Sequence, residues 1–222
     1  MPVFECSRCN DLTYSSSKAN VAPCARCGAE RRRMVDAAAS FAEAKAVPRA
    51  VSYGDHSIAV FDDFEQVAPL AVQFIDQAVL AGGLVMVAVP EELEDLIHER
   101  MLPEDEQGVF WEPPSDTYGP TFAPHDVVER FREIAEAEER PVFVLGCADE
   151  PIQNFTSREG WAEYERLAHE TAVAYGLTVL CLYDARLHDE TMLRAGLRTH
   201  ALKVDAGQYH RNEAFDYEPP GA

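Results

Sequence analysis

Short apolar runs alternate with longer amphipathic stretches over most of the chain after residue 53. Continuous apolar runs are typical of strands buried on both faces, and apolar residues spaced three or four apart are typical of helices that cover a sheet. The predicted strands are residues 57–61, 84–89, 108–111, 141–145, 177–183 and 201–204. The predicted helices are residues 64–80, 91–101, 126–139, 158–175 and 190–197. This order predicts an α/β fold with a three-layer, mainly parallel sheet.

Prolines indicate a departure from regular helices and strands at three places in the chain. Pro69 lies inside the apolar stripe of the first helix, so that helix is either kinked or begins later than the stripe suggests. Residues 112–124 contain four prolines and are predicted to form a loop. Residues 212–222 are polar and contain proline, and we expect a loosely held tail there.

Four of the six cysteines fall in two C-x-x-C turns near the start of the chain: Cys6, Cys9, Cys24 and Cys27. Two such turns bring four thiolates together around one tetrahedral zinc ion, and four cysteines leave no open position for catalysis. A pair of redox dithiols is the alternative. Residues 3–30 hold few apolar side chains, so we expect a structural zinc ion to supply most of the folding free energy of a small zinc ribbon.

The two ends of the chain carry opposite charge. The whole chain has 19 Lys and Arg against 39 Asp and Glu, a net charge of −20. Residues 1–33 hold six basic and three acidic residues, net +3, and residues 34–222 hold 13 basic and 36 acidic residues, net −23. Such an acidic body repels phosphate backbones and anionic lipids, which disfavours binding to nucleic acid or a membrane surface. Arg31, Arg32 and Arg33 are too short a basic run to change this, and we expect them in a solvated linker.

Residues 78–90 form the longest nearly apolar run, which is 13 residues long, contains Gly82-Gly83 and is too short to cross a bilayer. Residues 1–9 lack the apolar core of a secretory signal. We therefore expect a cytoplasmic protein.

In open α/β sheets, ligands bind beyond the carboxyl ends of the strands. The polar residues that follow the predicted strands are Asp62, Asp63, Glu91, Cys147, Asp149, Glu150, Asp184 and Arg186. We expect Asp62 and Asp63 to cap a helix, whereas turn chemistry and a site role are equally open for Asp184. Cys147 and Cys181 are expected as small buried residues.

Nucleotide and hydrolase motifs are missing from the sequence. It contains no G-x-x-x-x-G-K-[ST], no G-x-G-x-x-G after a strand and no G-x-S-x-G. A cysteine–histidine nucleophile pair would need Cys147 or Cys181, and a buried strand cysteine is usually inert. His56 and His200 sit at the starts of strands, and Glu165 lies within the longest helix; each is either a structural residue or a site residue.

Three stretches resemble the methanogen/methylotroph sensory (MEDS) domain family. They are residues 56–61 with 81–85, residues 161–165, and residues 179–184 with 198–200, inside a resemblance that spans residues 54–218. The resemblance implies a RecA-like core that has lost its nucleotide-binding loop and senses small hydrocarbon-derived molecules in prokaryotic signalling. It also implies ligand-binding roles for the residues that match the family's characteristic positions: His56, Glu165, Cys181, Asp184 and His200.

The sequence thus favours a sensory protein, not an enzyme, with a zinc ribbon at 1–33, a linker at 34–52, a sensory domain at 53–211 and a polar tail at 212–222. We expect its partner to be a protein, such as a kinase, an anti-sigma factor or the transcription machinery. One alternative is a hydrolase or transferase that uses His200 and the strand-end carboxylates in a crevice. A second alternative is a transcription-associated protein that acts through the zinc ribbon.

Overall fold

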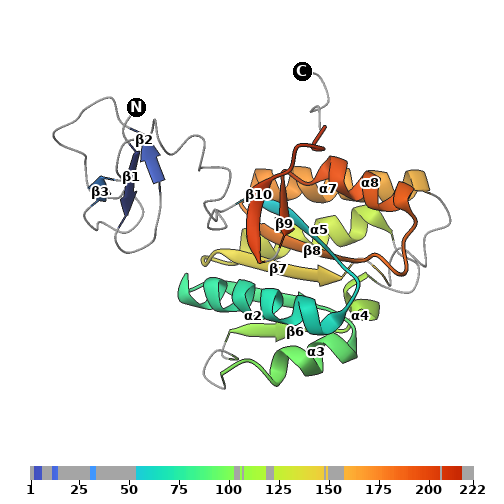
Figure 1. Cartoon of the computed structure of the whole chain (residues 1–222), viewed down its shortest axis with the longest axis horizontal. Helices are drawn as coiled ribbons and strands as arrows, with labels where there is room; N and C mark the ends of the chain where they lie inside the picture. Colours follow the sequence, from blue (N-terminus) through green and yellow to red (C-terminus); the bar gives the residue numbers. More distant parts are fainter. Residues whose placement is uncertain are drawn as a thin grey trace. The chain divides into compact units, whose positions relative to one another are not determined.

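The structure is a computed structural model of the whole chain (Figure 1). The chain forms two compact units, Met1–Ala50 and Val51–Ala222. It describes residues 3–6, 12–14, 31–33, 54–102, 106, 108–118, 123–147, 149, 158–205 and 207–216. Among these residues no helix has the length and apolarity needed to span a bilayer.

The first unit contains a small antiparallel sheet with the strand order β2-β1-β3. Its strands are β1 (Val3–Cys6), β2 (Leu12–Tyr14) and β3 (Arg31–Arg33). The three arginines therefore pair with β1 as a strand, and the linker predicted for them is wrong. Cys6 ends β1, whereas Cys9, Cys24 and Cys27 lie outside the described residues, so the zinc ribbon stays a prediction.

The second unit is built on a seven-stranded sheet with the order β10-β9-β4-β8-β7-β5-β6. Its strands are β4 (His56–Phe61), β5 (Leu84–Ala88), β6 (Val109–Trp111), β7 (Val142–Cys147), β8 (Thr178–Asp184), β9 (Leu202–Asp205) and β10 (Gln208–Arg211). Every neighbouring pair is parallel except β9 with β10. The predicted α/β class and mainly parallel sheet are confirmed.

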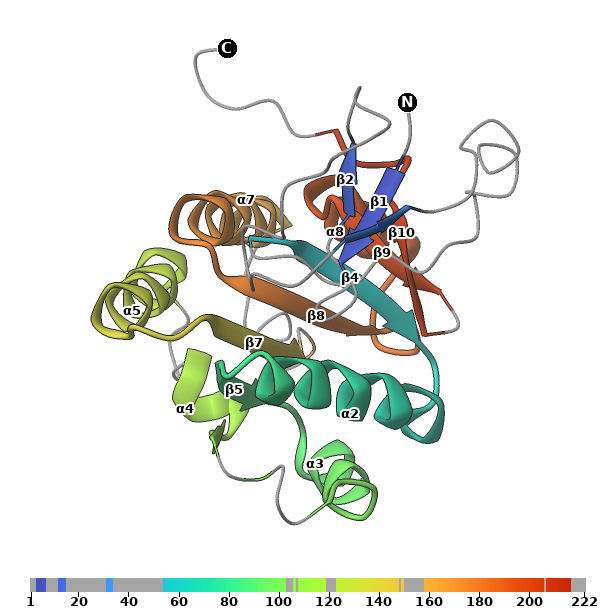
Figure 2. The same cartoon turned by 90° about the vertical axis from the view of Figure 1, so that its left-hand side faces the viewer.

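Helices cover both faces of this sheet (Figure 2). The helices are α2 (Phe64–Leu80), α3 (Glu91–His98), α4 (Pro114–Tyr118), α5 (Pro124–Ala137), α7 (Arg158–Tyr175) and α8 (Glu190–Thr199). Buried residues of α2 and α3 share one apolar core with one face of the strands, and those of α4, α5 and α7 share a second core with the other face. Because successive strand residues point to opposite faces, the central strands β4, β5, β7 and β8 contribute to both cores.

Helix α2 follows the predicted apolar stripe from its first residue. The Asp63 side chain accepts a hydrogen bond from the Glu65 backbone N–H at 3.0 Å, which caps the helix as expected. The helix begins at Phe64 and continues through Pro69, so the later start considered from the sequence does not occur.

The loop predicted over residues 112–124 is wrong in part, because Pro114–Tyr118 forms α4 and Pro124 already begins α5. Proline is well tolerated in the first turn of a helix, where its missing N–H has no intrahelical partner. The sequence also gave no sign of β10, whose polar residues carry one buried side chain, that of Tyr209. Gly207, at φ +74°, allows the tight turn that pairs β10 with β9.

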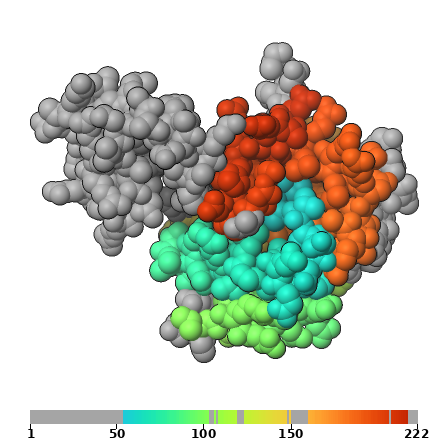
Figure 3. All heavy atoms as spheres, in the orientation of Figure 1, coloured from blue at the N-terminus to red at the C-terminus, as the bar shows by residue number. Residues whose placement is uncertain are grey.

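The start of the predicted loose tail is firmly held. Asn212 is buried, and its side-chain amide donates hydrogen bonds to the backbone oxygens of Leu197, at 2.5 Å, and His200, at 2.8 Å. The Asp216 backbone N–H donates to the Arg198 oxygen at 3.0 Å. In the space-filling view, the red C-terminal part of the chain packs directly against the cyan segment that holds β4 (Figure 3).

Asn212→Ala removes the donor from the carbonyls of Leu197 and His200. We expect the free energy of unfolding to fall by about 1–3 kcal/mol, because buried carbonyls lose their partner. Urea denaturation measures the change. The exposed neighbour Glu213→Ala is the control and should lie within about 0.5 kcal/mol of the unsubstituted protein. Equal stability of the two variants would contradict the anchoring role of Asn212.

Candidate functional site

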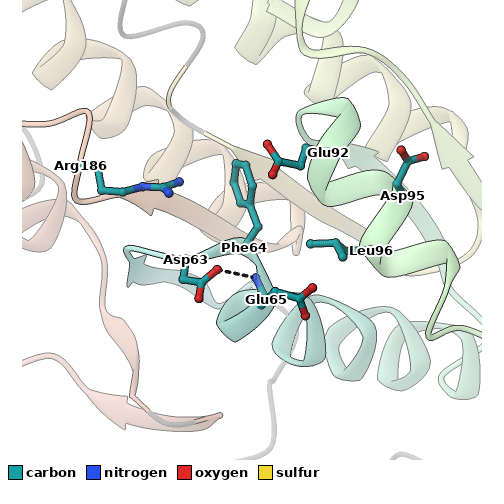
Figure 4. A pocket seen from close by; sticks show the side chains of 7 residues that line it. All are labelled: Asp63, Phe64, Glu65, Glu92, Asp95, Leu96 and Arg186. Carbon is teal, nitrogen blue, oxygen red and sulfur yellow. Dashed lines mark hydrogen bonds between the residues drawn. The ribbon is translucent and has the colours of Figure 1, made fainter.

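The carboxyl edge of the sheet, where the sequence placed a polar crevice, holds an open acidic groove of about 290 Å³. Asp63, Phe64, Glu65, Glu92, Asp95, Leu96 and Arg186 line it (Figure 4). Four of these seven residues are carboxylates and one is a guanidinium. Figure 4 shows the Arg186 side chain extending toward the ring of Phe64, with its guanidinium carbon 5.5 Å from the ring centroid.

Arg186 is already paired inside this groove. Its Nε lies 2.9 and 3.0 Å from the two carboxylate oxygens of Asp184, and its Nη2 lies 2.5 Å from Oδ2. The same Asp184 accepts the Arg186 backbone N–H at 2.8 Å, which is turn chemistry. The adjacent guanidinium lowers the pKa of Asp184. The groove therefore offers an anionic ligand four acidic side chains and a guanidinium that is already neutralised.

A buried hydrogen-bond network fixes the chain beside Asp184. Asp149 accepts the Asp184 backbone N–H at 3.0 Å and lies 2.6 Å from Nε2 of His188. The Cys147 thiol donates to the other Asp149 oxygen at 2.8 Å. Burial first and the Asp149 charge next raise the pKa of Cys147 well above its usual range. A thiol held protonated in this way is a poor nucleophile, and we assign the network a structural role.

The other four residues implied by the family resemblance meet in the interior. One ligand-type atom from each of His56, Glu165, Cys181 and His200 lies within 4.8 Å of the others, and we call these four side chains the polar cluster. The Cys181 Sγ is 3.4 Å from His56 Nε2. The Glu165 Oε2 is 3.9 Å from His56 Nε2 and 3.5 Å from His200 Nε2.

Strand register explains why these side chains meet and why Asp184 does not join them. Strands β4 and β8 run parallel with Ile58 opposite Cys181, so His56 and Cys181 project from the same face of the sheet. Asp184 lies an odd number of residues after Cys181 and so projects from the opposite face. The predicted crevice that joins Asp184 to the histidines is therefore wrong.

The polar cluster also lies away from the strand ends that the sequence favoured. His56 is the first residue of β4 and His200 directly precedes β9, so both stand at the amino ends of their strands. Glu165 reaches the cluster from α7, which covers this face of the sheet. The enzyme alternative, which placed His200 in a crevice with the strand-end carboxylates, therefore does not hold.

Burial sets the protonation of the polar cluster. Its histidines and Glu165 are at most 1% exposed. Burial raises the pKa of Glu165 to about 8, and the hydrogen bond from Tyr183 opposes this shift only in part. Burial also lowers the pKa of His200 to about 3 and raises that of Cys181 well above its usual range. For His56, burial and then the neighbouring His200 lower the pKa. By themselves, the four groups are therefore neutral at neutral pH.

Two further contacts hold the polar cluster in place. His200 Nδ1 lies 2.6 Å from the backbone oxygen of Gly196, and the Tyr183 hydroxyl donates to Glu165 Oε1. Glycine at position 196 lets α8 pack closely against Tyr183, because a Cβ there would lie 3.0 Å from the Tyr183 ring. Sequence reasoning gave Tyr183 no role, although it lies two residues after Cys181 and so on the same face.

A small apolar pocket reaches the polar cluster from the side of α5 and α7. It is lined by Tyr118, Val128, Phe131, Val144, Gly146, Tyr164, Ala168, Thr171, Leu177, Val179 and Cys181. Its volume of about 20 Å³ is room for roughly one water-sized group. Cys181 belongs both to this wall and to the polar cluster, so its sulfur connects the two. Nothing in the hydrophobic pattern could reveal a pocket that arises from how two helices pack.

We expect isothermal titration calorimetry with Mg-ATP at millimolar concentration to show no binding to this protein, because the groove repels phosphate. Magnesium chloride alone is the control, since carboxylates attract the cation whether or not a nucleotide binds. A dissociation constant of about 100 µM or lower for the nucleotide complex would contradict this reading of the groove.

A family model matches the part of the chain that holds the polar cluster. The model of the MEDS family, described as the MEthanogen/methylotroph, DcmR Sensory domain, matches residues 55–201. No curated protein sequence matches the chain.

Solved structures with a similar chain path include the flagellar accessory protein FlaH from Methanocaldococcus jannaschii, at 12% identity and a TM-score of 0.49 over 76% of this chain and 84% of that one. A unique ATP synthase subunit, NeqB from Nanoarcheaum equitans, matches at 13% identity and a TM-score of 0.48 over 72% of this chain and 52% of that one. The family match covers more than half of the chain and includes all four residues of the polar cluster. This chain belongs to the MEDS family of sensory domains.

Proposed function

We propose that this protein is a prokaryotic signal-transduction protein whose α/β domain binds a small, weakly polar molecule, such as a hydrocarbon derivative, in the pocket between α5 and α7. The observation that carries the proposal is the position of Cys181. Its side chain gives an apolar pocket a direct connection to a buried group of two histidines and a carboxyl group. Apolar walls with a few convergent polar groups are the usual composition of small-molecule sites.

The size of the pocket limits the ligand. About 20 Å³ accommodates a molecule with one or two heavy atoms, and a larger molecule requires α5 to move relative to α7. The lining is mostly aliphatic and aromatic, with Tyr118, Tyr164, Thr171 and Cys181 as its polar residues. Both tyrosines hold their protons because burial raises their pKa. Methanol and methanes with one halogen fit these limits better than carboxylic acids, whose charge would be buried without a cation.

Ligand binding would act on the packing between two helices. Helices α5 and α7 lie against each other over the same face of the sheet (Figure 2). Phe131 of α5 and Ala168 of α7 line the pocket. A ligand shifts an equilibrium between two arrangements only by its difference in affinity for them. We propose that the ligand favours a wider α5–α7 spacing, which would change the outer surface of both helices.

The response would pass to another protein through charged surfaces. The N-terminal 33 residues carry +3 and the remainder −23, so the two parts suit partners of opposite charge. A kinase, an anti-sigma factor or a component of the transcription machinery is the kind of partner we propose, in preference to nucleic acid. Contact with the transcription machinery through the N-terminal unit alone is the second form of this proposal.

The enzyme alternative has less support. His200 contacts Glu165 in the interior, and none of the strand-end carboxylates belongs to the polar cluster. The thiols of Cys147 and Cys181 both have a raised pKa, which suppresses nucleophilic chemistry.

A thermal-shift screen with one- to three-carbon alcohols, halocarbons and acids tests the ligand proposal. A neutral ligand at about 100 times its dissociation constant should stabilise the protein by about 2.7 kcal/mol. Ala168→Leu fills the pocket and should abolish the shift, whereas Ala162→Leu, on the exposed side of the same helix, should keep it. The proposal fails if no compound stabilises the unsubstituted protein, or if both variants respond alike.

We also propose that Cys6, Cys9, Cys24 and Cys27 bind a structural zinc ion. Replacing Cys9 and Cys24 by serine together should remove one zinc ion per chain, as measured by elemental analysis of the purified protein. Equal zinc content in the double variant and the unsubstituted protein would contradict the zinc ribbon.

A further inference from the structure

The geometry of the polar cluster points to a second metal site: we propose that His56, Glu165, Cys181 and His200 bind one divalent transition-metal ion, of the class of Zn²⁺ or Fe²⁺, inside the α/β domain. The proposal concerns the side chains beneath the pocket and holds whether or not a small molecule binds there.

The donor set suits such an ion. Two imidazoles, one carboxylate and one thiolate are four protein ligands, which is the number that a closed tetrahedral zinc site uses. Imidazole and thiolate favour zinc, iron and copper over magnesium or calcium, which prefer oxygen alone. The four residues come from β4, α7, β8 and the junction before β9, so the folded domain brings them together.

Three of the six separations between ligand atoms of the cluster lie close to those that a tetrahedral ion imposes. Bonds of about 2.0–2.3 Å place neighbouring ligand atoms about 3.3–3.8 Å apart. The observed separations are 3.4 Å for Cys181 Sγ to His56 Nε2, 3.5 Å for His200 Nε2 to Glu165 Oε2 and 3.9 Å for His56 Nε2 to Glu165 Oε2. The last two exceed ordinary hydrogen-bond lengths, so hydrogen bonding between these atoms does not explain why they converge.

Two of these atoms otherwise stay unsatisfied. Within the part of the chain that the structure describes, Glu165 Oε2 and His200 Nε2 are buried without a hydrogen-bond partner. A buried polar atom without a partner destabilises the folded protein, because it loses its hydrogen bonds to water and gains none. Two such atoms that face each other across 3.5 Å are most simply explained by an ion that both would bind.

Neighbouring groups orient the ligands in the manner of known metal sites. A backbone oxygen only accepts, so the contact of His200 Nδ1 with the Gly196 oxygen places the proton on Nδ1 and leaves the Nε2 lone pair facing the cluster. The Tyr183 hydroxyl donates to Glu165 Oε1, which leaves Oε2 for the ion.

Charge balance also favours a divalent ion. Bound Glu165 and Cys181 would be deprotonated and both histidines neutral, so an ion of charge +2 makes the whole group neutral. A neutral group is the least costly one to bury in an apolar interior. The ion thereby explains how a carboxyl group can lie at 1% exposure in a cluster that contains no lysine or arginine.

Metal content of the full-length chain tests the proposal. In the Cys9→Ser, Cys24→Ser background, which removes two of the predicted ribbon ligands, we expect the protein to keep one zinc or iron ion per chain after dialysis. Adding His200→Gln or Glu165→Gln should remove that ion. His169→Gln is the matched control, because His169 is buried with its ring 5.7 Å from that of His56 but is outside the cluster.

Cobalt supplies a second readout, which begins with the folded background protein itself. Co²⁺ added to the metal-free, folded Cys9→Ser, Cys24→Ser protein should give a thiolate-to-metal absorption band, which Cys181→Ser abolishes.

Tyr183→Phe should weaken metal binding about 10–100-fold in a competition with a chelator, while Tyr118→Phe leaves metal binding unchanged. If the folded Cys9→Ser, Cys24→Ser protein takes up neither zinc, iron nor cobalt, the cluster is a metal-free group of polar side chains and the proposal is wrong. Loss of the ion in the His169→Gln control alone would also overturn the assignment.

Discussion

The parallel pairing of β4 with β8 is the constraint on which the rest of the site depends. With Ile58 opposite Cys181, the pairing puts His56 and Cys181 on one face and sends Asp184 to the other. A shift of one residue would move His56 into the α2 face and break up the polar cluster. Helix α7, which covers this face of the sheet, brings Glu165 to the polar cluster, and the turn from α8 into β9 brings His200.

The two faces and edges of the domain thereby acquire different chemistry. The carboxyl edge is an open groove dominated by acidic side chains, where the one guanidinium is held by Asp184. The small pocket under α5 and α7 is mostly apolar, and next to it lie four titratable groups that burial keeps neutral. An anionic nucleotide is unsuited to the first environment, and a small neutral molecule suits the second.

Much of the fold could be predicted from the sequence because local patterns determine it. Helices α2 and α7 keep the limits that their apolar stripes indicate, and the buried strands read as continuous apolar runs. The sequence analysis missed helix α4 because it begins with a proline, and strand β10 because most of its residues are polar.

The candidate site was predicted in part. The family resemblance supplied His56, Glu165, Cys181 and His200. It also supplied Asp184, which the strand register places on the opposite face, and residue spacing alone does not define that register. The role of Tyr183 and the pocket between α5 and α7 depend on packing between distant segments, which local patterns do not report.

The central claim is that small molecules reach the face beneath α5 and α7 and not the carboxyl edge. Anomalous diffraction from crystals soaked in dibromomethane would locate the bromine atoms directly. The account predicts bromine between α5 and α7, beside Cys181. Bromine in the groove of Asp63 and Arg186, with none beside Cys181, would contradict it.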